Sequence, residues 1–222
     1  MQKHFLFGLI GLIVGMTIGF FAANLINKRD RATPTNISTI EPSDSTGDQI
    51  QGGIQSDVAE TLQQAEAEPQ NFAVQMKTGD MYARIGRFDK AIEFYKRGVA
   101  LRPTDLQANV VIANAFFDSG KFEDAESFYS SALLIDPQNI NARTDLGTTF
   151  VERQKPDYER AIKEFRSALE IDPKHAPTLY YLGIAYFRKG DLENANKALA
   201  ELEKADPASE LIGKLRQNMA KQ

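Results

Sequence analysis

The chain has 222 residues, of which 42% are apolar and 25% charged, a composition typical of globular proteins. Its formal charge of −4 argues against a nucleic-acid-binding protein, because such proteins usually carry a basic face. There is no cysteine and there are only two histidines, His4 and His175, which excludes disulfides, thiolate chemistry and histidine-rich metal sites. We therefore expect no catalytic residue, no metal and no cofactor.

The N-terminal segment contains an uncharged, largely apolar stretch from Phe5 to Ile26. As a helix these 22 residues span about 33 Å, enough to cross the roughly 30 Å hydrocarbon core of a bilayer. The alternative is a cleaved signal peptide. The stretch exceeds the usual apolar region of such peptides, and the bulky Phe21 stands where cleavage favours a small residue. We predict a retained single-pass anchor, residues 1–31, in the cell (inner) membrane.

The side of the membrane on which the remaining chain lies stays open. Lys3 flanks one end of the apolar stretch, and Lys28, Arg29 and Arg31 flank the other. The positive-inside rule favours a cytoplasmic C-terminal body by about one charge, which is too small a margin to decide the orientation.

Small residues recur every four positions within the predicted anchor. This spacing lets two helix backbones approach closely, which predicts a packing stripe for a dimer or a membrane partner. The alternative is the general abundance of glycine in membrane helices. The stripe consists of Gly11, Gly15, Gly19 and Ala23.

Residues 32–57 form a second zone, rich in Ser, Thr, Gly and Pro and without any Lys, Arg or aromatic residue. Such a segment cannot bury enough apolar surface to offset the entropy lost on ordering. We therefore predict a disordered polar and acidic linker.

The rest of the chain contains an internal repeat of about 34 residues. Pro69, Pro103, Pro137, Pro173 and Pro207 are spaced by 34, 34, 36 and 34 residues. Within each unit a small residue, an aromatic residue, an alanine and a large ring or leucine recur in the same order. These columns are Gly79, Ala113, Gly147 and Gly183; Tyr82, Phe116, Phe150 and Tyr186; Ala91, Ala125, Ala161 and Ala195; and Tyr95, Tyr129, Phe165 and Leu199. The repeat predicts a stack of similar units.

Each unit is predicted to be a pair of antiparallel helices. Apolar residues at helical spacing precede and follow a glycine turn at Gly86, Gly120 and Gly190, and a proline ends the second helix. The small residues are expected to leave room for the large rings. In unit three, two extra residues in the stretch 153–158 predict a protruding turn between two intact helices.

The spacing and residue types resemble the tetratricopeptide repeat (TPR) family, whose pattern is W-x₂-L-G-x₂-Y…A-x₃-F…P. Residues 176–209 match this pattern most fully. The resemblance implies an all-α fold, a right-handed superhelical solenoid of four helix-turn-helix repeats. The tryptophan position instead holds Gln75, Asn109, Arg143 and Leu179, which predicts looser packing in the first three units.

Polar-backed helices are expected to cap both ends of the array. Asp57 stands at the expected start of the first cap and Ser209 at that of the last. The expected organisation is an N-terminal cap, 58–71, four repeats, 72–209, and a C-terminal cap, 210–222. The repeats are 72–105, 106–139, 140–175 and 176–209.

The resemblance also implies a concave groove, lined by the first helix of each unit, that binds a peptide or a helix. Carried over position by position, the groove residues are Met76, Asp80, Val110, Asn114, Phe117, Thr144, Thr148, Tyr180, Ile184 and Phe187. The alternative is that the apolar members of this set pack between repeats and belong to the core.

One subtype of the family is excluded. TPR domains of chaperone cofactors grip a C-terminal carboxylate through Lys, Asn and Arg side chains. The matching positions here hold Met76, Asp80, Val111, Asn141 and Asp145, so the cationic clamp is missing.

These features predict a membrane-tethered scaffold or adaptor, similar to bacterial single-pass TPR proteins, that binds protein partners and takes part in assembling a membrane or envelope complex. It is not expected to be an enzyme. One alternative is a structural protein that self-associates through the membrane stripe and the terminal helices. A narrower alternative is an assembly factor similar to the TPR proteins of cytochrome c maturation. The partner's identity stays open.

Overall fold

The computed structural model describes residues 59–220, so the predicted anchor, its small-residue stripe and the predicted linker lie outside the described residues. Residues 59–67 are helical, and residues from Gln64 onward belong to one compact unit. The described residues form helices and turns, without a strand. The predicted all-helical fold is therefore confirmed for this part of the chain.

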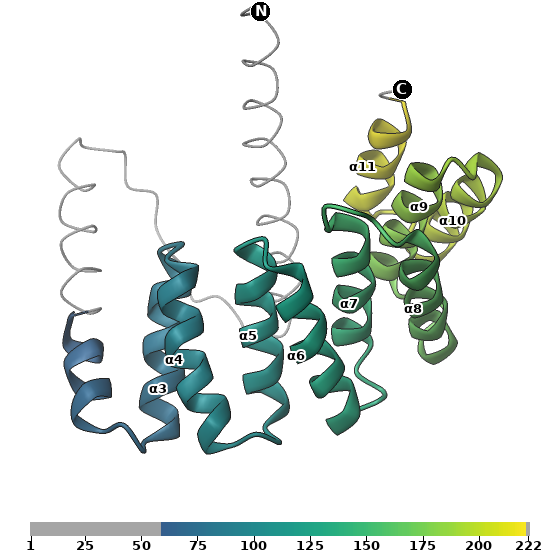
Figure 1. The fold of residues 1–222 in the computed structure, drawn as a ribbon. Coiled ribbons are helices and arrows are strands. Elements are labelled where there is room, and N and C mark those ends of the chain that lie inside the picture. The colour runs from purple at the N-terminus through teal and green to yellow at the C-terminus, as the bar shows by residue number, and fades with distance from the viewer. Residues whose placement is uncertain (1–58, 221–222) are drawn as a thin grey trace, which may run out of the picture. The chain divides into compact units, whose positions relative to one another are not determined.

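Eight helices form four consecutive antiparallel pairs. They are α3 (Phe72–Arg84) with α4 (Phe88–Leu101), α5 (Leu106–Asp118) with α6 (Phe122–Ile135), α7 (Ile140–Glu152) with α8 (Tyr158–Ile171), and α9 (Ala176–Lys189) with α10 (Leu192–Ala205). Each pair packs on the next, so the pairs follow one another in chain order from teal to yellow (Figure 1). This stacking buries apolar faces that one pair alone could not cover.

The glycine turns are confirmed in three pairs. Gly86, Gly120 and Gly190 have φ between 72° and 88°, a left-handed conformation that a side chain disfavours. The third pair has no such glycine. There α7 ends at Glu152 and α8 begins at Tyr158, with Asp157 accepting a hydrogen bond from the Arg160 backbone amide as the N-cap. The two extra residues replace the glycine, and both helices stay intact as predicted.

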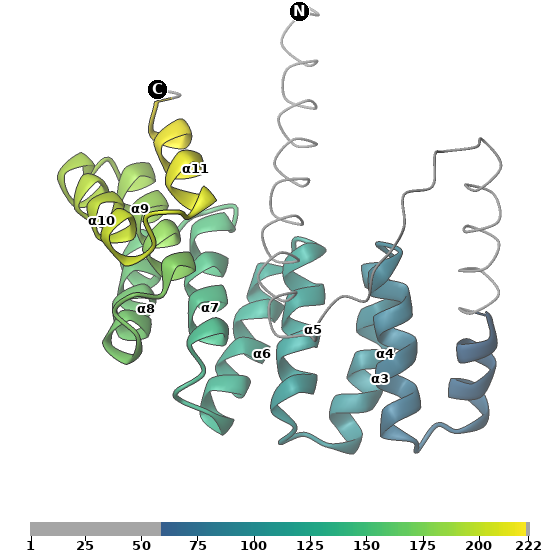
Figure 2. The ribbon, with the colours of Figure 1, turned by 180° about the vertical axis from the view of Figure 1, so that it is seen from behind.

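The expected fit of rings over small residues is also confirmed. A Cβ added to Gly79 would lie 2.4 Å from the Tyr95 ring, and one added to Gly147 would lie 2.5 Å from the Phe165 ring. In the fourth pair the hollow over Gly183 is filled by Leu215 of α11 (Glu210–Met219), because Leu199 is only half-buried. Ser209 caps α11, and α11 lies beside α9 in both views (Figures 1 and 2).

The expectation of looser packing at the tryptophan position is wrong for two of the units. Gln75 is 0% exposed and Asn109 is 2% exposed. The Gln75 side chain donates to the carbonyl of Ala65 at 2.8 Å, and the Asn109 side chain donates to that of Pro103 at 3.0 Å. These amides take the place of an indole by donating to a carbonyl of the preceding helix (Ala65) or of the preceding turn (Pro103), because a buried amide group needs hydrogen-bond partners.

The hollow over Gly147 gives a first testable prediction. We expect Gly147→Ala to lower the free energy of unfolding by about 1–3 kcal/mol, because the new methyl group overlaps the fully buried Phe165 ring. Gly213→Ala is the matched control, since nothing lies within 4 Å of its added Cβ and alanine favours the helix by up to about 1 kcal/mol. Urea unfolding followed by circular dichroism measures both variants. Equal stability of the two proteins would contradict the packing described here.

Candidate functional site

The first helices of the four pairs carry the predicted groove residues, and we call their partly exposed surface the first-helix face. It is formed by α3, α5, α7 and α9. Among the predicted residues, Asp80 is exposed and four others are partly exposed. These four are Met76, Val110, Asn114 and Phe117. The accessible part of the predicted set therefore belongs to units one and two.

The remaining predicted residues are buried. Thr144 is 3% exposed and Thr148 is 7% exposed, and each hydroxyl donates to a backbone carbonyl one turn earlier at 2.9 Å. In unit four, Tyr180 and Phe187 are each 8% exposed and Ile184 is 6% exposed. Packing between helices accounts for these five positions, and the binding role assigned to the whole set stays a prediction.

Helix α11 explains part of the burial in unit four. The Asn218 side chain donates to the Tyr180 hydroxyl at 3.1 Å, and Leu215 packs over Gly183 of the same helix. Helix α11 thus packs on α9 as a first helix of a further pair would, and it leaves little of Tyr180 accessible. The sequence predicted a helix after the fourth pair, but only the structure shows that this helix covers α9.

Tyrosines of the second helices orient polar residues of the first-helix face. The Tyr95 hydroxyl donates to Asp80 Oδ1 at 2.7 Å, and the Tyr129 hydroxyl contacts Asn114 Oδ1 at 2.7 Å. Burial is the main cause that raises the pKa of both tyrosines, so both hydroxyls keep their protons at neutral pH. The same position in unit three holds Phe165 and in unit four Leu199, so this polar arrangement is confined to units one and two.

Two carboxyl groups lie where units two and three meet. Burial raises the pKa of Asp118, at the end of α5, to about 6. Burial, with a smaller contribution from the charge of Asp118, raises the pKa of Asp145 of α7 to about 7. Within residues 59–220 neither carboxylate has a hydrogen-bond or salt-bridge partner. Sequence reasoning used Asp145 only to exclude a carboxylate clamp.

Asp145 occupies a position that is apolar in the neighbouring units. The repeat spacing aligns it with Val111 of unit two, Tyr181 of unit four and Leu215 of α11, whereas unit one holds the exposed Lys77. Tyr181 stacks on the Phe165 ring with centroids 6.3 Å apart, and Leu215 is fully buried over Gly183. Asp145 is half-buried, and a half-buried acid is unfavourable unless it has a partner. Comparing the aligned units position by position was the signal that could have singled it out.

Salt bridges between neighbouring units lie at the edges of the stack. Arg153 binds Glu126 at 2.8 Å, Arg160 binds the same carboxylate, and both guanidinium groups lie over the Phe150 ring. Arg188 of α9 binds Glu152 of α7 at 2.8 Å. These arginines are engaged, so they do not neutralise Asp118 or Asp145.

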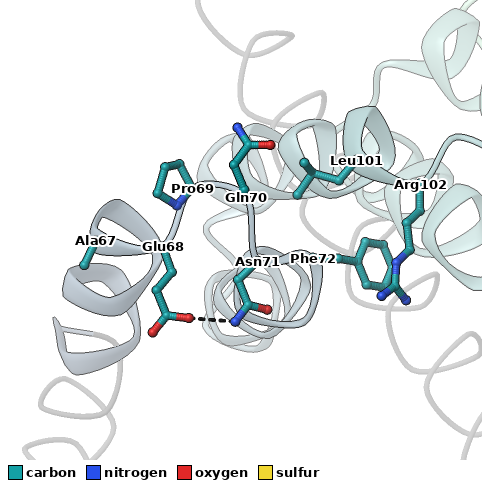
Figure 3. A pocket seen from close by; sticks show the side chains of 8 residues that line it. All are labelled: Ala67, Glu68, Pro69, Gln70, Asn71, Phe72, Leu101 and Arg102. Atoms are coloured by element: carbon teal, nitrogen blue, oxygen red, sulfur yellow. Dashed lines mark hydrogen bonds between the residues drawn. The ribbon is translucent and has the colours of Figure 1, made fainter.

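An open hollow lies at the turn before α3 (Figure 3). Its polar groups already have structural partners. Asn71 donates to Glu68 at 2.6 Å and caps α3, and the Arg102 guanidinium lies 4.3 Å from the centroid of the Phe72 ring. The lining residues are Ala67, Glu68, Pro69, Gln70, Asn71, Phe72, Leu101 and Arg102. The hollow follows from the turn and is not a candidate site.

Two other kinds of site are absent from the part of the chain that the structure describes. Residues 59–220 contain no group of three or more potential ligands placed to hold a metal ion. None of the helices in this range is sufficiently long and apolar to cross a membrane.

Solved structures share the fold. A crystal structure of MamA aligns with a TM-score of 0.64 and 21% identity, covering 76% of this chain and 97% of that one. MamA from Desulfovibrio magneticus RS-1 aligns with a TM-score of 0.64 and 17% identity, covering 73% of this chain and 90% of that one. A tetratricopeptide repeat protein from Parabacteroides merdae aligns with a TM-score of 0.67 and 19% identity, covering 76% of this chain and 66% of that one.

No curated protein is significantly similar in sequence to the chain. Two family models, both of the tetratricopeptide repeat, match the chain. One matches residues 83–146 and 153–219, and the other matches residues 57–105. The matched segments cover more than half of the chain and coincide with the four helix pairs and α11. The chain therefore belongs to the tetratricopeptide repeat family.

Proposed function

We propose that this protein is a membrane-tethered scaffold whose first-helix face holds a segment of a partner protein. Tetratricopeptide repeat proteins are generally scaffolds without an active site, and the fold is consistent with protein–protein interaction. The observation that carries the proposal is the partly exposed pair Val110 and Phe117 on α5, beside the oriented polar groups of Asp80 and Asn114. Apolar and aromatic side chains supply most of the energy of typical interfaces.

The membrane part of the proposal is supported by the sequence of residues 1–31 alone. A single-pass anchor in the cell (inner) membrane would raise the effective concentration of the repeats for neighbours in the same bilayer. Alkaline extraction of membranes checks the anchor, and protease protection of the intact membranes decides its sidedness. Release of the full chain by alkali would contradict the anchor and leave the proposed binding face unaffected.

Site-specific photocrosslinking tests the binding face. We expect a photoreactive residue at position 117 of the full chain, in its native membrane, to crosslink to one specific protein. The matched control places the same residue at position 134, because Leu134 is 85% exposed and lies on a second helix. Phe117→Ser should abolish co-purification of the identified partner, whereas Leu134→Ser should leave it unchanged.

The same experiment can contradict the proposal. Phe117 also packs edge-on against Phe122, with centroids 5.4 Å apart, so the melting temperature of Phe117→Ser must be measured beside its binding. A crosslink from position 134 and none from position 117 would move the interface to the second helices. Changing Phe187 together with Phe117 would be less informative, because Phe187 is only 8% exposed and its loss would damage packing.

A further inference from the structure

The junction between units two and three carries negative charge that the described residues leave uncompensated. The carboxyl groups of Asp118 and Asp145 are near enough for the charge of one to act on the other, and both act on the Tyr129 hydroxyl between them in the chain. Neither has a cationic partner in residues 59–220. Burial removes part of the hydration of both carboxylates. A cation supplied by a partner would compensate for this loss through a charge-assisted hydrogen bond.

The surroundings of the two carboxyl groups add as many acids as arginines, so the charge of Asp118 and Asp145 stays in excess. The other titratable and charged groups that face this junction are acids, tyrosines and two arginines. They are Asp80 and Arg84 of α3, Tyr95 of α4, Tyr129 of α6, Glu152 of α7, and Tyr180, Tyr181 and Arg188 of α9. Helix α8 presents the uncharged Phe165. Arg188 is held by Glu152, so acids outnumber the available cations.

Apolar surface adjoins the acids. Val110, Val111 and Phe117 of α5 are partly exposed, and so is Tyr181 of α9. A face that combines these groups with unpaired carboxylates is complementary to a segment that carries both apolar and basic side chains. The missing chaperone-type clamp is consistent with this polarity, since Asp80 and Asp145 would repel a carboxylate.

Asp145 also differs from its equivalents in the neighbouring units. Val111 and Tyr181 hold the same place there, Leu215 holds it in α11, and unit one has the exposed Lys77. Partial burial costs an apolar residue less than it costs an unpaired acid. A residue that weakens the fold without a structural partner is best explained by a partner outside the chain.

We infer that the first-helix face at the junction of units two and three binds a basic amphipathic segment of a partner protein, whose Lys or Arg side chains pair with Asp118 and Asp145. This inference rests on the proposed function and names the chemistry of the partner. Apolar residues of the segment contact Val110 and Phe117. Deprotonation of the two carboxyl groups between pH 5 and pH 8 strengthens the binding.

The test measures binding of two fluorescent helical peptides to the full chain in a neutral detergent, corrected for binding to detergent alone. One peptide is built from Leu and Lys, and the other replaces each Lys with Glu. We expect only the Leu/Lys peptide to bind, with an affinity that rises between pH 5 and pH 8. The double variant Asp118→Asn, Asp145→Asn should bind it about ten- to hundredfold more weakly and lose the pH dependence.

A matched control separates this site from the general acidity of the chain. The double variant Glu123→Gln, Glu170→Gln removes two exposed acids of the second helices, and neither glutamate has an ion pair within residues 59–220. This variant should leave the affinity unchanged. The stability of the site variant is an independent readout. Because a raised carboxyl pKa costs stability as pH rises from about 4 to about 7, Asp145→Asn should raise the melting temperature at pH 8 and leave it unchanged at pH 4.

Several outcomes would overturn the inference. Absence of Leu/Lys peptide binding, or equal weakening by both double variants, would show that the two carboxylates form no binding site. Preference for the Leu/Glu peptide, with loss on Phe117→Ser, would retain the proposed binding face and reject its basic partner. Equal competition by a peptide of residues 27–32, which contains Lys28, Arg29 and Arg31, would assign the face to the chain's own basic stretch.

Discussion

Phe165→Ala should lower the free energy of unfolding by about 3–5 kcal/mol, the range for removing a fully buried ring. The Phe165 side chain is 0% exposed. It fills the hollow over Gly147 and stacks on Tyr181 of the next pair, with an interplanar angle of 15°. The substitution therefore removes contacts within unit three and contacts between units three and four. Urea unfolding of the full chain, followed by circular dichroism, measures the loss.

The matched control is Leu199→Ala, because Leu199 holds the same repeat position in unit four and is only half-buried. We expect its loss to be well under half that of Phe165→Ala. The difference arises because α11 supplies Leu215 over Gly183, whereas the three atoms nearest to a Cβ added at Gly147 all belong to the Phe165 ring. Similar losses in the two variants would contradict the difference in packing between the third and fourth pairs.

Leu215→Ala should cost about 2–5 kcal/mol and should act mainly on the C-terminal end. Leu215 is 0% exposed and is the one fully buried side chain of α11. Without it we expect α11 to detach, which frees the Tyr180 hydroxyl from Asn218 and exposes α9. Hydrogen exchange should accelerate in α11 and on the face of α9 beneath it.

Lys214→Ala is the control for this prediction, because Lys214 is exposed on the same helix and its 3.9 Å pair with Glu210 contributes little. Its amide exchange and melting temperature should match those of the unchanged chain. Accelerated exchange spread evenly over all four pairs in Leu215→Ala would contradict a local role for α11, since repeat units contact only their neighbours.

The repeat could be recognised from the sequence because the same physical demands recur in every unit. A glycine with positive φ favours a tight helix turn, and a large side chain must face a small residue. Both demands leave a column of residue types, such as Gly86, Gly120 and Gly190, and the structure confirms them. In unit three the column is broken, and two extra residues provide the turn by another route.

The accessibility of the predicted groove could not be derived in the same way. The repeat pattern identifies which residues lie on the first helices but not what covers them. Tyr180 and Phe187 occupy the positions equivalent to the partly exposed Val110 and Phe117. They are buried because units three and four and α11 pack closely. The packing at the tryptophan position was mispredicted for a related reason, since the hydrogen bonds of Gln75 and Asn109 to backbone carbonyls leave no trace in the repeat pattern.

The paired arginines on Glu126 have a mechanical consequence. Arg153 and Arg160 join unit three to unit two through one carboxylate, at the same junction that carries Asp118 and Asp145. Arg188 with Glu152 and Lys189 with Glu159 join unit four to unit three through more exposed groups than Arg153 and Glu126. Added salt screens exposed ion pairs more strongly than partly buried ones. Under tension applied along the chain, the stiffness of the third junction should therefore fall more with ionic strength than that of the second.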